Sequence, residues 1–413
     1  MKTIFRTTSV ALFLAALIAI GAVAGFAQDP CADADGQTAL GDKFRALYPK
    51  TSIDDRKAAI DTGKQFLEKY GSCESAKELS DYLKTTIPKL EDVLAKMVKA
   101  ASVKKLVGDF TAAVPAARWD DVYSNGKLLL AENPDEYRAV ELVMGSIGLD
   151  ETAKSPRVTK WNDDTLRYAK MSIADLEAGK KFPQYGFGKY AYNDKADALA
   201  WMNYTIGFIL TYDKNDKRSA VPYLYKASQA TTSNTSKTPQ VYQAIAGFYF
   251  DDVNRLIKEV KDLVADQKDS DTPEVAKQKA DTIKARIGML NGTTERAIDA
   301  YGRALDLANA NKSSQTYRDG LQKTINELYN VRFAKTDGAA AWVAASIKKP
   351  FVDPMTPVTP VIDPEPVTAT APGTVKPGTP KPTTPPTKPV TPGSKPGVSS
   401  NTANPSVKKV ANK

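Results

Sequence analysis

The sequence contains no histidine, only two cysteines and, beyond its first residues, no long apolar run. Without histidine, Ser-His-Asp triads, imidazole acid–base catalysis and His-based zinc sites are excluded. Cys31 and Cys73 are too few and too far apart for a zinc cluster or a CxxC redox pair. Neither a glycine-rich phosphate loop nor a GxSxG motif occurs. We therefore expect no catalytic residues, no metal and no cofactor, and predict that the protein is not an enzyme.

The formal net charge of +9 lies at the two ends of the chain. Lys2 and Arg6 stand near the N-terminus, and seven lysines but no acidic residue follow Glu365. The remaining residues, 28–365, have a net charge of zero. A body without basic excess is poorly suited to neutralise phosphates, so we expect no nucleic-acid partner.

The N-terminus predicts a signal peptide over residues 1–27. Lys2 and Arg6 precede an apolar run from Val10 to Ala27, which ends in small residues typical of a cleavage site. An uncleaved membrane anchor is the alternative, because the run is just long enough to span a bilayer. We expect a periplasmic or secreted protein with no membrane span after cleavage.

An exported chain with two cysteines most simply forms one disulfide, so we predict a Cys31–Cys73 bridge. A lipid anchor on Cys31 is the competing idea. The preceding residues, Ala27-Gln28-Asp29-Pro30, do not resemble a bacterial lipoprotein box, and we reject that anchor.

Composition changes abruptly at Pro350, because 16 of the 26 prolines lie from there to the end. Proline, threonine, lysine and glycine cannot supply a core, so residues 350–413 are predicted to be a disordered, basic tail. It is interpreted as a solvated linker. Two alternatives are attraction of its lysines to an anionic envelope polymer and O-linked glycosylation of its threonines.

Residues 28–349 are predicted to form one helical repeat domain. Helix-forming residues dominate and β-branched alternation never lasts, while breakers recur at the spacing of one or two helices. Those breakers are Pro49, Gly71, Pro88, Pro115, Pro134, Pro156, Pro183, Pro222, Pro239 and Pro273. Several of these prolines are expected in the first turn of a helix. The pattern predicts antiparallel helical hairpins.

Internal similarity supports a repeat. "AIDTGKQFLEKYG" (59–71) parallels "VYSNGKLLLAENP" (122–134), with Gly-Lys, two large apolar residues and a breaker at equal offsets. In "ERAIDAYGRALDLANA" (295–310), small and large residues share one helical face. Such a face is buried only when another helix comes close, which is the logic of a repeat stack.

These residues resemble the tetratricopeptide repeat family. Ala297-x3-Tyr301 matches its second helix, and residues 118–139 have the expected aromatic entry at Trp119, the aliphatic pair Leu129-Leu130 and the closing Pro134. The resemblance covers about 310 residues but is divergent, because Gly126 replaces an aromatic residue and the spacing is nearer 40 than 34 residues. It implies an all-α, TPR-like α-solenoid that holds a protein segment in a groove. The alternative is a multi-helical bundle of other connectivity.

Paired carboxylates are the remaining candidates for chemistry. Most of the pairs open apolar helical runs, where they stabilise the helix N-terminus, and we interpret them in that way. The pairs are Asp54-Asp55, Asp120-Asp121, Asp163-Asp164 and Asp251-Asp252. Asp33-Ala-Asp35-Gly36 is similar to the start of a calcium loop but lacks the later ligands.

We call the segment 181–194, "KFPQYGFGKYAYND", the aromatic loop. It contains five aromatic rings and three residues that disfavour helix, and tyrosine-rich loops can anchor a partner or stack on sugars. The candidate partner-binding residues are Phe182, Tyr185, Phe187, Tyr190 and Tyr192. The alternative is a loop folded down onto neighbouring hairpins.

The function expected from the sequence is an exported, non-enzymatic scaffold that binds a protein or peptide of the cell envelope. The second hypothesis is a carbohydrate- or peptidoglycan-binding module that uses the aromatic loop. The third is a glycan-cleaving enzyme acting through buried carboxylates, which would need two acids that face one cleft.

Overall fold

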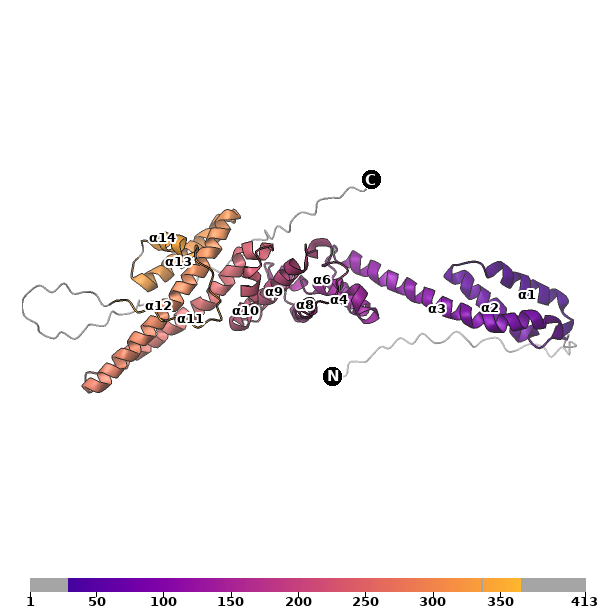
Figure 1. Cartoon of the computed structure of the whole chain (residues 1–413), viewed down its shortest axis with the longest axis horizontal. Coiled ribbons are helices and arrows are strands. Elements are labelled where there is room, and N and C mark those ends of the chain that lie inside the picture. The colour runs from indigo at the N-terminus through magenta and orange to yellow at the C-terminus, as the bar shows by residue number, and fades with distance from the viewer. Residues whose placement is uncertain (1–28, 336, 365–413) are drawn as a thin grey trace, which may run out of the picture. The chain divides into compact units, whose positions relative to one another are not determined.

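The computed structural model describes residues 29–335 and 337–364 (Figure 1). The predicted signal peptide and all of the tail beyond Pro364 lie outside these residues. Within 29–335 and 337–364, helices provide all of the regular secondary structure, which confirms the predicted all-α class. None of the helices in these ranges has both the length and the apolarity needed to cross a bilayer.

The chain forms two compact units that divide between Lys104 and Lys105, inside helix α3. Residues 28–349, predicted as one domain, contain separate core clusters. Phe44, Phe66 and Leu83 belong to a cluster within the first unit, and a larger cluster lies in the second.

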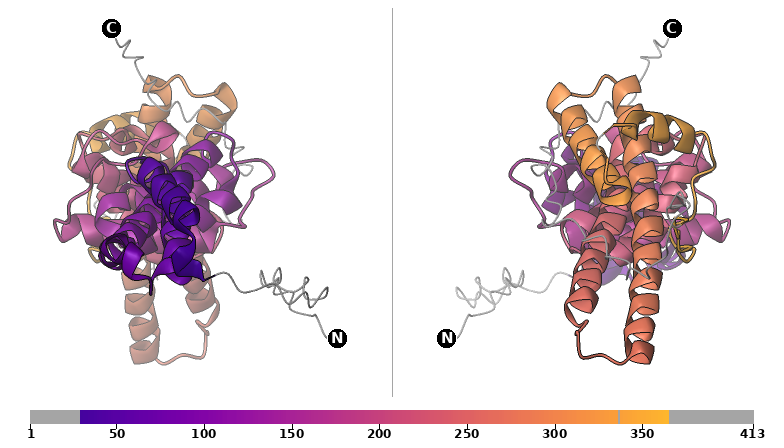
Figure 2. Two further views of the ribbon diagram at one scale, coloured as in Figure 1. Left: turned by 90° about the vertical axis from the view of Figure 1, so that its right-hand side faces the viewer. Right: turned by 90° about the vertical axis from the view of Figure 1, so that its left-hand side faces the viewer.

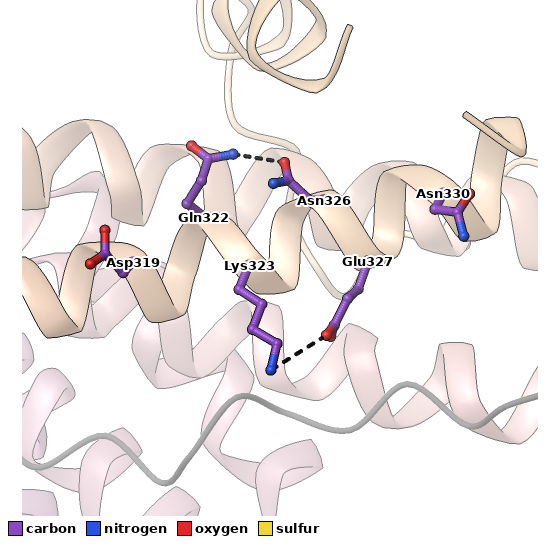
Figure 3. A pocket seen from close by; sticks show the side chains of 6 residues that line it. All are labelled: Asp319, Gln322, Lys323, Asn326, Glu327 and Asn330. Atoms are coloured by element: carbon purple, nitrogen blue, oxygen red, sulfur yellow. Dashed lines mark hydrogen bonds and ion pairs between the residues drawn. The ribbon is translucent and has the colours of Figure 1, made fainter. Parts of the chain in front are cut away.

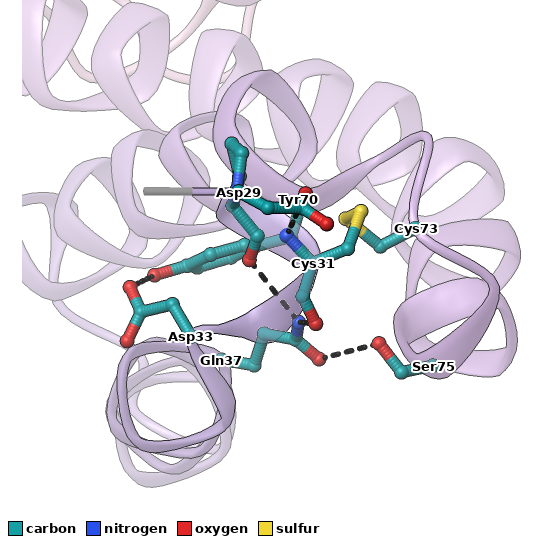
Figure 4. Close-up of a disulfide and its surroundings, with 8 residues drawn as sticks. Asp29, Cys31, Asp33, Gln37, Tyr70, Cys73 and Ser75 are labelled. Atoms are coloured by element: carbon teal, nitrogen blue, oxygen red, sulfur yellow. Dashed lines mark hydrogen bonds between the residues drawn. A yellow bond between two sulfur atoms is a disulfide. The ribbon is translucent and has the colours of Figure 1, made fainter. Parts of the chain in front are cut away.

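Unit 1 packs three helices around a small aromatic core. It contains α1 (Ala34–Leu47), α2 (Ile53–Tyr70) and the first part of α3 (Lys77–Ala113). The predicted disulfide is present and joins Cys31 to Cys73, with Cα atoms 5.2 Å apart (Figure 4).

Asp33, which resembled a calcium ligand, serves as the N-cap of α1. One oxygen of its carboxylate accepts a hydrogen bond from the Gly36 amide, and the other accepts one from Lys69 Nζ. The second oxygen also accepts a hydrogen bond from the Tyr70 hydroxyl (Figure 4). These bonds lower the pKa of Asp33 to about 2, and the Tyr70 bond contributes most. The carboxylate is therefore part of the packing between α1 and α2.

Unit 2 is a longer succession of helices, most of which pack on their neighbours in sequence. Its elements are α4 (Trp119–Glu132), α5 (Pro134–Tyr137), α6 (Ala139–Met144), α7 (Ile147–Thr152), α8 (Asn162–Glu177), α9 (Lys195–Tyr212), α10 (Lys217–Gln229), α11 (Pro239–Ala265), α12 (Pro273–Ala310), α13 (Gln315–Phe333) and α14 (Ala339–Ser346). The two long helices α11 and α12 lie side by side as an antiparallel hairpin (Figure 2). Ala297 and Ala304 of α12 are fully buried, as the small-residue face predicted.

The proline predictions are correct in part. Pro134, Pro239 and Pro273 begin α5, α11 and α12, where the absent N–H has no helical partner to lose. Pro88 and Pro222 instead lie inside α3 and α10, so the breaks predicted there are wrong. Burial of the residues that flank each proline outweighs the one helical hydrogen bond that it removes.

Three of the four carboxylate pairs lie at a helix N-terminus, as the sequence indicated, and one does not. Asp54-Asp55, Asp120-Asp121 and Asp163-Asp164 lie in the first turns of α2, α4 and α8, where they favour the helix dipole. Asp251-Asp252 lies in the middle of α11, where Asp251 pairs with Lys217 and Asp252 with Arg255.

Candidate peptide-binding site

A non-helical segment near the end of the described residues, with one turn at Pro354–Thr356, lies along α12. We call residues 350–364 the strap. These residues belong to the tail predicted to begin at Pro350, and α12 and α13 bind their main chain and side chains. The α12 residues that contact the strap or the turn before it recur at helical spacing: Gly288, Asn291, Gly292, Arg296 and Arg303.

Most contacts are made to the strap's main chain. Arg296 donates hydrogen bonds to the carbonyl oxygens of Thr356 and Pro357, at 2.6 and 2.9 Å. Asn291 donates to the Val361 carbonyl at 3.1 Å, and the Val361 amide donates to the Gly288 carbonyl at 2.8 Å. A surface that forms hydrogen bonds with main-chain carbonyl and amide groups binds the peptide backbone more than a particular side chain.

Two glycines allow this close approach. A Cβ atom on Gly292 would stand 2.3 Å from the Thr359 carbonyl oxygen, which no side chain tolerates. A Cβ atom on Gly288 would be 3.3 Å from the Pro360 side chain. The bare helix backbone therefore forms the floor on which the strap lies.

A carboxylate clamp holds the end of the strap. Arg332 of α13 binds Asp363 with two parallel hydrogen bonds of 2.8 Å and also donates to Glu295 at 2.7 Å. Its side chain is only 5% exposed. Burial lowers the pKa of Arg332, but the two carboxylates outweigh that effect and the pKa is raised. Bidentate arginine–carboxylate pairs of this kind are strong and directional.

An aromatic cage holds the other end. The ring of Phe351 lies 5.2 Å from Tyr242 and 6.1 Å from Tyr225, measured between ring centroids. The Arg303 guanidinium stacks 5.0 Å from the same ring and donates to the Lys349 carbonyl at 2.6 Å. The strap is thus fixed by an aromatic anchor at its start and a carboxylate at its end.

The aromatic loop predicted to bind a partner is folded against unit 2. Tyr190 is buried, and its hydroxyl donates to Asp150 at 3.1 Å, while the Tyr192 hydroxyl is hydrogen-bonded to Ser146. Burial raises the pKa of both tyrosines. These two rings serve the internal packing of the loop.

The other three rings are half-buried. Phe187 packs edge-on to Phe110 at 5.3 Å, and Phe182 stacks on Tyr185 at 6.1 Å with Arg138 beside it. The structure therefore distributes the five predicted residues over separate internal contacts and does not gather them into one exposed surface.

The buried carboxylate of Glu141 lies near a second acidic residue, Asp175. Glu141 of α6 is 2% exposed, and burial, with the charge of Asp175 second, raises its pKa to about 7. Asp175 is itself paired with Arg138 and Lys180. In residues 29–335 and 337–364, no cluster of three acidic or cysteine ligands suited to a metal occurs.

A shallow, open depression of about 440 Å³ lies elsewhere, along the outer face of α13 (Figure 3). Gln322 and Asn326 are hydrogen-bonded to each other there, and Lys323 pairs with Glu327 at 4.0 Å. All of its lining residues come from one helix. It supplies neither converging groups nor an enclosed volume.

Sequence reasoning missed the strap because its proline content resembled that of the rest of the tail. One signal was available. Phe351, Asp353 and Asp363 lie within the strap, whereas residues 366–413 contain neither an aromatic nor an acidic residue.

Comparison with known proteins found no matching family model, no curated protein and no solved structure similar to this chain.

Proposed function

We propose that the protein is an exported, non-enzymatic scaffold whose second unit binds an extended segment of a protein partner in the cell envelope. The observation that carries the proposal is the strap, a non-helical segment held on α12 mainly through its main chain. A helix surface built in this way is a peptide-binding surface.

Two further features support the proposal. Unit 2 is a succession of neighbouring helices, as in the TPR-like α-solenoid that the sequence resembles, and such stacks present elongated surfaces to partners. The disulfide between Cys31 and Cys73 suits an oxidising compartment outside the cytoplasm, which agrees with export by a signal peptide.

The test is capture of partners from an envelope extract by the full-length chain. Protease treatment of the extract should abolish capture, because the partner is a protein. Asn291→Ala should weaken capture, since Asn291 donates to the main chain of the bound segment. Asn326→Ala removes the same amide group from the outer face of α13 and is the matched control. Retention of the chain by insoluble, protein-free glycan would contradict the proposal and favour carbohydrate binding.

The second expectation from the sequence, carbohydrate binding by the aromatic loop, has no observation in its favour. Its rings pack within unit 2, where a sugar would have to displace them.

A further inference from the structure

The sequence contains the tetrapeptide Pro-Val-Thr-Pro twice. The first copy, residues 357–360, is the part of the strap that lies over Gly288 and Gly292 of α12. The second, residues 389–392, lies outside the described residues. The two copies differ three residues after their last proline, where one has Asp363 and the other has Lys395.

This difference falls on the carboxylate clamp. Arg332 is almost wholly buried and makes its two parallel bonds to Asp363. A lysine at that position would bring a second positive charge close to Arg332 and would leave the guanidinium with Glu295 as its carboxylate partner in place of two carboxylates. The surface therefore discriminates between two segments that share the same four residues.

The rest of the strap is bound in a way that another segment could reproduce. Arg296, Asn291 and Gly288 contact backbone atoms that every extended peptide has. Several of the strap's own large side chains remain in solvent: Val352, Met355 and Ile362 are 49%, 52% and 56% exposed. The side chains that determine specificity are thus those of Pro-Val-Thr-Pro at residues 357–360, Asp363 and Phe351.

We infer that this α12 surface is a receptor for an extended Pro-Val-Thr-Pro-like segment of a partner protein that carries a carboxylate three residues after its last proline. Residues 351–363 are the internal competitor that such a segment displaces. The inference rests on the proposed function and specifies the chemistry of its partner.

The test uses the full-length chain and a fluorescent synthetic peptide with the sequence of residues 351–364. In the wild-type chain the strap competes from within the molecule at a high effective concentration. Phe351→Ala combined with Asp363→Asn removes both ends of the internal competitor and leaves α12 and α13 unchanged. Fluorescence anisotropy should show peptide binding at least about tenfold tighter to this double variant than to the wild type.

The control peptide has the sequence of residues 383–396, which keeps Pro-Val-Thr-Pro but presents Lys395 in place of Asp363 and Thr383 in place of Phe351. It should bind the double variant at least about tenfold more weakly than the first peptide, because it lacks both the carboxylate that pairs with Arg332 and the aromatic anchor. A second control, the first peptide with Asp363→Lys, separates the two contributions. Adding Asn291→Ala to the double variant should weaken binding of the first peptide. Tryptophan fluorescence that is unchanged from the wild type verifies that unit 2 of each variant is folded. If the double variant does not fold, the single variant Asp363→Asn is used in its place.

Equal binding of the two peptides would overturn the inference, as would no binding by a folded variant. If envelope protein is still captured through Asn291 in that case, the inference fails and the proposed function stands. If the peptide with the sequence of residues 351–364 binds but no envelope protein is captured, the proposed function fails and the peptide specificity of α12 stands.

Discussion

Unit 1 and unit 2 are stabilised in different ways. Unit 1 has few helices and a small core, and it is closed covalently by Cys31–Cys73. Unit 2 has no cysteine and relies on a long series of buried apolar contacts, completed by the strap. The comparison shows that one chain can combine a unit closed by a disulfide with a unit held by noncovalent contacts. The disulfide matters in the first unit because a small core buries too little apolar surface to be stable without a further constraint.

Removing the disulfide should have the largest effect and should be confined to unit 1. Cys31→Ala with Cys73→Ala releases a loop of 42 residues, for which chain entropy gives a loss of about 4 kcal/mol. Every tryptophan lies in unit 2, so far-UV circular dichroism should show an early transition that tryptophan fluorescence does not. Equal shifts in both signals would mean that the units unfold as one.

Overpacking α12 should destabilise unit 2 alone. Ala304 is fully buried, so Ala304→Leu forces a larger side chain into a filled interior and should cost about 2 to 3 kcal/mol. Denaturant unfolding followed by tryptophan fluorescence measures the loss. Ala285→Leu, at an exposed position of the same helix, is the control and should change stability little.

The buried Glu141 should make the stability of unit 2 depend on pH. Its pKa is raised from 4.5 to about 7, so its stabilising contribution is complete below pH 4.5 and is lost as pH rises through 7. Glu141→Gln should therefore stabilise unit 2 by about 2 kcal/mol near pH 8 and have little effect near pH 4. Urea melts at both pH values test this, with Glu132→Gln as the exposed control. A gain that is equal at both pH values would contradict the role of the charge.

Asp33 should produce a smaller and opposite dependence in unit 1. Its pKa is lowered from 3.8 to about 2, so its contribution is present above pH 3.8 and is lost as pH falls through 2. Asp33→Asn should remove part of the acid sensitivity seen by circular dichroism while tryptophan fluorescence stays unchanged. Asp35→Asn is the neighbouring control, and an equal effect there would show that the contacts of Asp33 with Tyr70 and Lys69 are not responsible.

The class of the fold and several helix starts were predictable because they depend on local chemistry. Pro134, Pro239 and Pro273 each begin a helix, where a proline loses no helical hydrogen bond. The small face containing Ala297 and Ala304 requires a close neighbour. The disulfide was predictable because only one pairing is possible. Pro88 and Pro222 misled the prediction, because burial of flanking residues is a tertiary effect that outweighs a local preference.

The candidate site was not predictable from local patterns. Arg332 and Asp363 are separated by 31 residues, and Phe351 meets Tyr225 and Tyr242 from more than one hundred positions away. The aromatic loop attracted attention because its rings are consecutive in sequence. Their burial depends on helices that the loop sequence does not specify.

The sequence by itself determined the helical class, the Cys31–Cys73 disulfide, the zero net charge of residues 28–365 and the absence of histidine. Each of these follows from residue types and short-range spacing. Only the tertiary structure decided that the chain divides within α3 and that a proline-containing strap binds across α12 to a buried arginine. The physical reason is that these features come from desolvation and close contact between distant segments, and such contacts form only when the whole of each unit has packed.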